Sequence, residues 1–99
     1  MGYQIVWTES GNNDLKQIVS FIAIDDSDAA ERFGLSIIDQ IEALSAHPRM
    51  ERIVPEEQIE EIRELIVPPY RIVYEIYETE RVIYVVRVWH SARGKPQIH

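Results

Sequence analysis

The chain has 99 residues, no cysteine and a formal net charge of −7. A chain of this length builds one modest core, so we expect a single domain over residues 1–99. The lack of cysteine excludes disulfides, thiolate nucleophiles and cysteine-ligated zinc. Without a signal peptide pattern or an apolar run long enough to cross a membrane, we expect a cytoplasmic protein that does not associate with membranes.

The acidic average hides an uneven distribution of charge. Residues 1–49 contain three basic residues against eight acidic ones. Residues 81–99 contain no acidic residue, and four basic ones give this segment a charge of +4: Arg81, Arg87, Arg93 and Lys95. Because the whole molecule should be repelled by a polyphosphate at long range, we expect direct contact with nucleic acid, if any, only through this C-terminal tail.

The N-terminal part of the chain changes from a strand pattern to a helical one. Residues 3–7 alternate and are rich in strand formers, and Thr8 then offers cap chemistry. Apolar residues at i, i+3, i+4 and i+7 predict an amphipathic helix over residues 11–24. Its apolar face consists of Leu15, Ile18, Val19 and Ile22.

A second amphipathic helix follows a short polar break. The acidic side chains of residues 25–28 can accept hydrogen bonds from the first free amides of this helix. The helix must end by His47, because Pro48 disfavours helical geometry in the residue before it. Two helices joined by so short a connection form a helical hairpin. The apolar stripe of the second helix is Ala30, Phe33, Ile37, Ile38, Ile41 and Leu44.

The C-terminal half predicts a loop and three strands. Residues 48–60 mix charges with two prolines, so we expect a loop with one helical turn after Pro55. Strands are predicted near residues 61–67, 70–78 and 81–90, and their short connections make them antiparallel neighbours. Both faces of the last strand are largely apolar, which places it centrally, covered by the hairpin on one side and by the tail or a partner on the other. The predicted architecture is α+β, of order β-αα-βββ, with the helical hairpin packed on a small antiparallel sheet.

Basic side chains interrupt the apolar runs of these strands. Arginine is seldom buried unless it is paired or binds a ligand, so Arg71, Arg87, His90 and Arg93 form the candidate functional set. One interpretation is an anion-binding patch in which guanidinium groups hold a phosphate or carboxylate and the histidine transfers a proton. The other, favoured on the residues alone, is structural ion pairing within the meander. The carboxylates in reach are Glu61, Glu64, Glu75 and Glu78.

Strand alternation divides this set. It places Arg71 on the face of its strand away from the core, and it places Arg87 and His90 on opposite faces of the last strand. His90 is interpreted either as a proton-transfer group or as a core histidine bonded to backbone. The aromatic residues are interpreted as cross-strand packing rather than as a platform for stacking bases: Tyr70, Tyr74, Tyr77, Tyr84 and Trp89.

The sequence contains no motif for a metal or a nucleotide cofactor. A glycine-rich phosphate loop, a His-Glu-x-x-His helix, a nucleophile elbow and a calcium loop are all absent. The three histidines, His47, His90 and His99, are widely separated. We therefore predict no cofactor and no metal site.

Five short motifs, in this order and spacing, resemble the RelE/ParE family of type II toxin-antitoxin toxins, in particular its ParE-like branch. They are Trp7-Thr8, Asp14-Leu15, Arg63-Glu64-Leu65, Tyr70-Arg71-Ile72-Val73-Tyr74 and Arg87-Val88-Trp89-His90-Ser91-Ala92-Arg93. The resemblance implies a bacterial toxin neutralised by a cognate ParD-like antitoxin, whose segment wraps the helical hairpin. The residues expected to contact the antitoxin are Leu15, Ile18, Ile22, Phe33 and Ile37.

The resemblance implies one of two activities. RelE-like members are ribosome-dependent mRNA endonucleases, for which the matching catalytic residues here are Arg71, His90 and Arg93. ParE-like members bind and poison DNA gyrase. Because Ser91 stands where a nuclease would have an aromatic residue and the chain contains only two lysines, we expect a gyrase-binding inhibitor that is not an enzyme. Its target-binding residues would be Arg87, His90, Arg93 and Lys95. An mRNA endoribonuclease and a non-toxic relic that binds antitoxin remain the alternatives.

Overall fold

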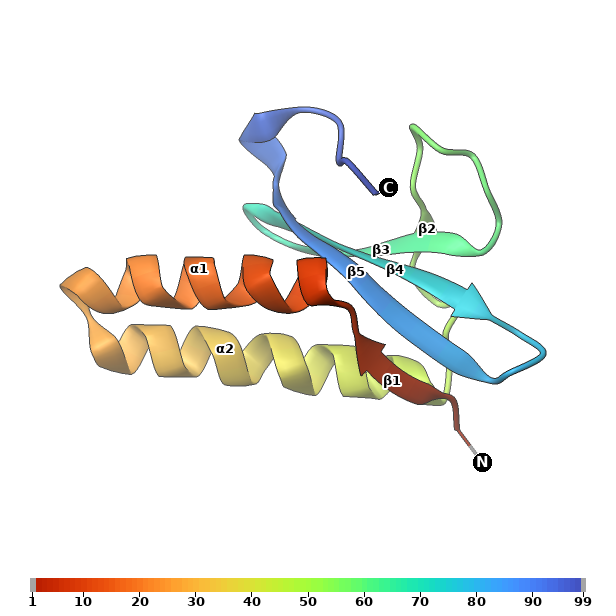
Figure 1. Cartoon of the computed structure of the whole chain (residues 1–99), viewed down its shortest axis with the longest axis horizontal. Helices are drawn as coiled ribbons and strands as arrows, with labels where there is room; N and C mark the ends of the chain where they lie inside the picture. The colour runs from red at the N-terminus through yellow and green to blue at the C-terminus, as the bar shows by residue number, and fades with distance from the viewer. Residues whose placement is uncertain (1, 99) are drawn as a thin grey trace.

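The computed structural model describes residues 2–98 and shows two helices packed on one face of a sheet (Figure 1). Met1 and His99 lie outside the described residues. The α+β architecture and the order of the predicted elements are confirmed. The elements are β1 (Gln4–Trp7), α1 (Glu9–Asp25), α2 (Ser27–Glu42), a 3-10 turn (Ala43–Ser45), β2 (Arg52–Ile53), β3 (Ile62–Val67), β4 (Tyr70–Tyr77), β5 (Val82–His90) and a second 3-10 turn (Ser91–Arg93).

The sheet has five strands in the order β1-β5-β4-β3-β2. The predicted antiparallel meander is formed by β3, β4 and β5. The sheet differs from the prediction in being mixed, because β1 pairs in parallel with β5 in the register Gln4↔Val82 to Trp7↔Val85. The helical hairpin makes this pairing possible, since it carries the chain back across the sheet. A two-residue strand, β2, lies within the segment predicted as a loop and pairs with β3.

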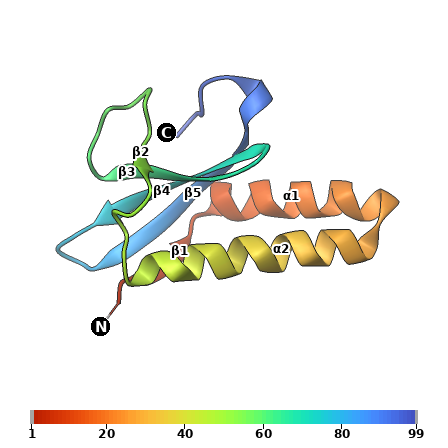
Figure 2. The same ribbon diagram turned by 180° about the vertical axis from the view of Figure 1, so that it is seen from behind.

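Both helices begin at polar caps. The Thr8 hydroxyl accepts a hydrogen bond from the Gly11 amide at 3.1 Å, so α1 begins earlier than predicted. The carboxylate of Asp26 accepts from the Ala29 amide at 3.0 Å and starts α2. The two helices run side by side, and the end of the hairpin that holds their connection extends past the sheet (Figures 1 and 2).

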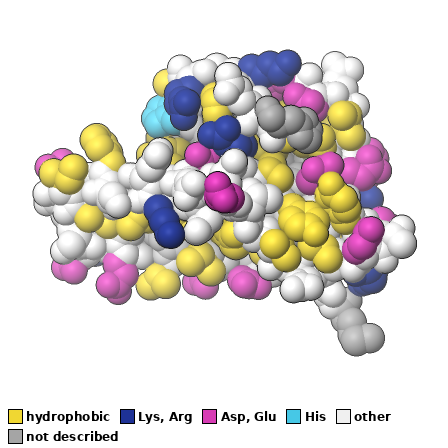
Figure 3. Space-filling model, viewed as in Figure 1, with side chains coloured by type: hydrophobic (Ala, Val, Ile, Leu, Met, Phe, Trp, Pro, Cys, Tyr) yellow, Lys and Arg dark blue, Asp and Glu magenta, His cyan; other side chains and the backbone are white. Residues whose placement is uncertain are grey.

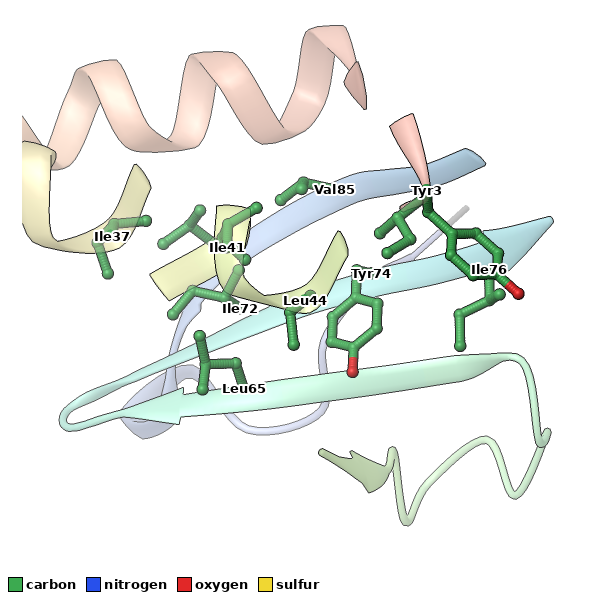
Figure 4. Packing of buried hydrophobic residues seen from close by; sticks show 11 residues of the cluster. Tyr3, Ile37, Ile41, Leu44, Leu65, Ile72, Tyr74, Ile76 and Val85 are labelled. Atoms are coloured by element: carbon green, nitrogen blue, oxygen red, sulfur yellow. The ribbon is translucent and has the colours of Figure 1, made fainter. Parts of the chain in front are cut away.

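The main core lies between the helices and the sheet (Figure 4). From α2 and the turn after it come Ile37, Ile41 and Leu44, which are buried against side chains of β4 and β5. Tyr74 is fully buried and donates its hydroxyl to the Pro48 carbonyl at 2.7 Å. Burial raises the pKa of the Tyr74 hydroxyl well above its usual value, so it stays a donor at all physiological pH values.

A second, smaller core lies on the opposite face of the sheet. It is formed by Val54, Ile62 and Val73, with Val86 and Ile98 packed against it. A turn closed by the Gln58 amide on the Val54 carbonyl, at 3.0 Å, matches the single helical turn predicted after Pro55. The loop before β3 and the C-terminal segment therefore both cover this face. Of the tail and the partner that were predicted to cover it, the structure shows the tail.

Candidate functional site

Arg71 is held between two carboxylates on the face of the sheet away from the helices. Its Nε atom donates to Glu64 of the neighbouring strand at 2.6 Å, and its Nη atoms donate to both oxygens of Glu56 at 2.6 and 3.0 Å. The residue is 8% exposed, and Glu64 is fully buried. The hydrogen bonds from Arg71 hold the pKa of Glu56 at about 2. The guanidinium donors are therefore occupied by the protein itself, as the structural interpretation predicts.

Other arginines of the sheet and its loops also form ion pairs. Arg52 pairs with Glu64 at 2.6 Å, and Arg63 pairs with Glu60 and donates to the carbonyls of residues 49, 51 and 60. Arg49 forms ion pairs with Glu60, at 2.7 Å, and with Glu78, at 3.1 Å. These pairs lower the pKa of both carboxyl groups. In Glu78 the hydrogen bond from the Tyr3 hydroxyl lowers the pKa most. Of the predicted partners, these pairs use Glu64 and Glu78. Sequence reasoning missed Glu56 and Glu60, which lie in the loop.

Arg87 joins three parts of the chain. Its Nε and Nη2 atoms donate to the two oxygens of Asp14 on α1, at 2.8 and 3.0 Å, and its Nη1 atom donates to the Gln97 carbonyl at 2.9 Å. The same carboxylate accepts from the Val88 amide at 3.0 Å. Asp14 therefore accepts a backbone hydrogen bond from the edge of β5, beyond the residues of β5 that pair with β1. The positive charge of Arg87 is compensated within the protein.

The C-terminal segment is folded back onto Trp89. The guanidinium carbons of Arg87 and Arg93 lie over the indole at 4.9 and 4.2 Å from its centroid. The indole Nε1 donates to the Gly94 carbonyl at 3.1 Å. Lys95 follows, exposed to solvent. The part of the predicted basic tail that follows β5 is therefore a docked segment, and its Arg93 and Lys95 present their charge on the surface.

His90 lies on the helix side of the sheet, at the end of β5. Its Nδ1 atom accepts a hydrogen bond from the Ala92 amide at 3.0 Å, and its ring meets the edge of Tyr70 at 5.3 Å. The register pairs His90 with Tyr70 and pairs Arg87 with Val73 of the second core, so the predicted separation of His90 and Arg87 by strand face is observed. The structure brings His90 and Arg93 to one pocket and leaves Arg71 on the opposite face.

The helical hairpin buries some of the residues expected to contact an antitoxin. Ile37 is fully buried in the main core, so it is not available at a surface, and this prediction needs correction. Leu15, Ile18 and Phe33 pack partly against the same core, and Ile22 is half-buried. Helical period alone did not separate residues that face the sheet from residues on the far side.

Other apolar side chains of the hairpin are exposed and were missed. Phe21 and Ile24 are 73% and 79% exposed, and Leu35 and Ile38 also face solvent. A groove of about 420 Å³ between the helices is lined by Leu15, Val19, Ala30, Leu35 and Ile38, among others. For Phe21, Ile24 and Leu35, the signal that could have found this surface is that they are large apolar residues outside the two predicted apolar stripes.

A family model described as the ParE toxin of the type II toxin-antitoxin system parDE matches residues 5–94 of this chain. The chain belongs to this ParE toxin family. A search of curated proteins finds no match. Membership of the ParE family agrees with the resemblance inferred from the five sequence motifs.

Solved structures with the same fold include both ParE-type and RelE-type systems. The ParDE system of P. aeruginosa aligns with a TM-score of 0.72 and 16% identity, over 89% of this chain and 95% of that one. The RelBE2 complex of Mycobacterium tuberculosis aligns with a TM-score of 0.68 and 18% identity, over 91% and 99%. A mutant of the E. coli toxin RelE in the free state aligns with a TM-score of 0.55 and 16% identity, over 95% and 88%. The ParE-family chain described here thus shares its fold with toxins of both branches.

Within residues 2–98 of this ParE-family toxin, no three histidine, cysteine or acidic residues are placed to hold a metal ion. None of the helices described is long and apolar enough to cross a membrane.

Proposed function

We propose that this ParE-family toxin acts by binding DNA gyrase, and that it does not cleave RNA. The observation that supports this proposal best is the closed environment of Arg71. A nuclease needs a guanidinium that faces the phosphate during the reaction, whereas Arg71 donates to Glu56 and Glu64 and is 8% exposed. His90 lies on the other side of the sheet, so the three residues of the nuclease hypothesis do not share one site.

The charge of the molecule supports the same proposal. At a net charge of −7, the toxin approaches the RNA of a ribosome against long-range repulsion. Arg93, Lys95 and His90 are the residues of the C-terminal segment that we propose to contact gyrase. Arg87, predicted as a fourth, has the different role of holding this segment to α1 through Asp14.

We also propose that a cognate antitoxin covers the helical hairpin. The support is the exposed apolar surface formed by Phe21, Ile24, Leu35 and Ile38, which a monomer in water leaves uncovered. Solved structures of the same fold are described as ParDE and RelBE systems. An amphipathic segment of the antitoxin that lies across this surface would bury its apolar side chains and those of the toxin together.

Expression of the toxin alone tests the proposed target. We expect growth arrest, loss of gyrase supercoiling activity and DNA breaks, with primer-extension maps of cellular mRNA unchanged. The double variant Arg93→Ala/Lys95→Ala should reduce inhibition of purified gyrase about tenfold or more, because two surface cations are lost. Cleaved message with intact supercoiling would contradict the proposal, and absence of growth arrest would favour a non-toxic relic that binds antitoxin.

A further inference from the structure

A pocket of about 240 Å³ opens between α1 and the end of β5. It lies on the helix side of the sheet, away from Arg71 and its carboxylates. Its apolar walls are Ile18, Phe21, Tyr70 and Val88. Its polar groups are Asp14, Gln17, His90 and Arg93.

Arg93 gives this pocket a positive charge. Five other arginines of the described chain form ion pairs with carboxylates: Arg49, Arg52, Arg63, Arg71 and Arg87. Arg93 has no carboxylate partner within residues 2–98, and its described contact is with the ring of Trp89 at 4.2 Å. In a chain with seventeen acidic residues, an arginine that lines a pocket and has no acidic partner can pair with a carboxylate of another molecule.

The acidic residue in the pocket wall does not cancel this charge. Both oxygens of Asp14 are taken by Arg87, and one of them also accepts from the Val88 amide. On His90, the Nδ1 atom accepts from the Ala92 amide, so in the neutral ring the proton is on Nε2, which can donate. The pocket therefore offers a guanidinium, an imidazole N–H and the Gln17 amide beside an apolar wall.

We propose that this pocket receives an acidic side chain of the antitoxin, next to an apolar one. The inference rests on the proposed docking of the antitoxin on the hairpin. Phe21 lines the pocket and is 73% exposed, so the pocket opens beside an exposed apolar side chain of α1. In Figure 3, basic and histidine side chains gather over the C-terminal segment above α1, beside hydrophobic side chains of the helices. An antitoxin segment that runs along α1 then places a carboxylate on Arg93 and covers a cation that we propose to contact gyrase.

The first test measures the affinity of the toxin for the antitoxin encoded beside it, by calorimetry at low and high salt. Arg93→Gln should weaken binding about tenfold and flatten its salt dependence, and Arg93→Lys should retain most of the affinity. Arg32→Gln removes the same charge from an exposed position of α2 outside the pocket and should change the affinity less than about twofold. Thermal unfolding of each variant verifies that the fold is retained.

Charge reversal identifies the partner residue. Each acidic residue of the antitoxin is changed to lysine in turn. One of these antitoxin variants should bind the wild-type toxin more weakly and should bind the toxin variant Arg93→Glu with restored affinity. If Arg93→Gln binds as the wild type does while Leu35→Asp abolishes binding, the antitoxin docks on the hairpin but this pocket does not receive it. If neither variant weakens binding, the proposed antitoxin surface itself is wrong.

A small probe tests the chemistry of the pocket without the antitoxin. Sodium 3-phenylpropionate and its neutral amide are titrated into the labelled toxin and followed through the indole N–H resonance of Trp89. The carboxylate should bind at least about fivefold more tightly than the amide, and Arg93→Gln should remove this difference. Equal binding of the two compounds would overturn the assignment of the pocket to an acidic group.

Discussion

The guanidinium of Arg71 is held by carboxylates from two different segments, Glu64 on β3 and Glu56 in the loop before it. Glu64 also pairs with Arg52, so the network contains two arginines and two glutamates. Buried charges are tolerated only while their partners are present, because the cost of removing each from water is several kcal/mol. At the scale of single residues, this network keeps the loop against the sheet and Arg71 away from solvent.

Removing Arg71 should destabilise the fold. Arg71→Ala leaves the fully buried Glu64 with Arg52 as its remaining partner, and we expect the free energy of unfolding to fall by about 3 kcal/mol. Arg93→Ala, at an exposed position, should cost less than about 1 kcal/mol. Urea denaturation measures both. The double variant Arg71→Met/Glu64→Leu should recover much of the loss, and a wild-type midpoint for Arg71→Ala would contradict a structural role.

The pKa of Glu56 predicts how stability depends on pH. Arg71 lowers this pKa from an ordinary value of 4.5 to about 2, so the carboxylate stabilises the folded state fully above about pH 4.5. The contribution is lost as the pH falls from there toward about 2. Glu56→Gln should therefore show a shallower fall in urea midpoint over this range than the wild type. Parallel curves for the two proteins would show that the ion pair does not contribute.

At the scale of elements, α1 lies unusually close to β5. A Cβ atom on Gly11 would lie 2.4 Å from the Val85 carbonyl oxygen, so only glycine permits this approach. Thr8 donates to the same carbonyl at 3.1 Å, and Asp14 accepts from the Val88 amide, so two hydrogen bonds on either side of Gly11 hold the start of the helix to the strand. The position of α1 thus determines one wall of the pocket that contains His90 and Arg93.

Two glycine variants test this contact against a matched control. Gly11→Ala should lower the free energy of unfolding by about 2 kcal/mol, because the helix must move away from Val85. Gly34→Ala, within α2, would place its Cβ atom 3.5 Å from Val19, an ordinary contact, and should leave stability unchanged or raise it by about 0.5 kcal/mol. Chemical denaturation distinguishes the two. Equal effects would show that the approach to β5 is not tight.

The elements that local pattern predicts well are those with a clear period. Strands expected at 61–67, 70–78 and 81–90 are found at Ile62–Val67, Tyr70–Tyr77 and Val82–His90. The parallel pairing of β1 and the short β2 were not predicted, because both depend on contacts distant in sequence and leave no periodic signal. The same reason explains why the role of Glu64 was expected and that of Glu56 was not.

At the scale of the whole molecule, the hairpin is longer than the sheet that it covers. The chain measures 42 × 31 × 21 Å along its principal axes, and the end of the hairpin extends past the strands along the longest of them. Helical period correctly predicted an apolar face for each helix. It could not tell which apolar residues face the sheet and which stay exposed, which is why Ile37 was predicted to contact the antitoxin and Phe21 was overlooked.

Polar substitutions at exposed apolar positions of the hairpin should separate folding from antitoxin binding. Ile24 and Leu35 are 79% and 55% exposed, so Ile24→Asp/Leu35→Asp should change the melting temperature of the isolated toxin by no more than a few degrees. The same variant should be more soluble alone, because its exposed apolar area is smaller. It should also lose most of the increase in melting temperature that added antitoxin gives the wild type. A full increase in the variant would place the antitoxin elsewhere.

The parallel pairing of β1 with β5 also determines when the toxin can complete its fold. Residues 4–7 pair with residues 82–85, so β1 and α1 cannot complete their packing until β5 has been synthesised. A toxin mRNA that is truncated before the codons of β5 therefore yields no folded toxin, however often it is translated.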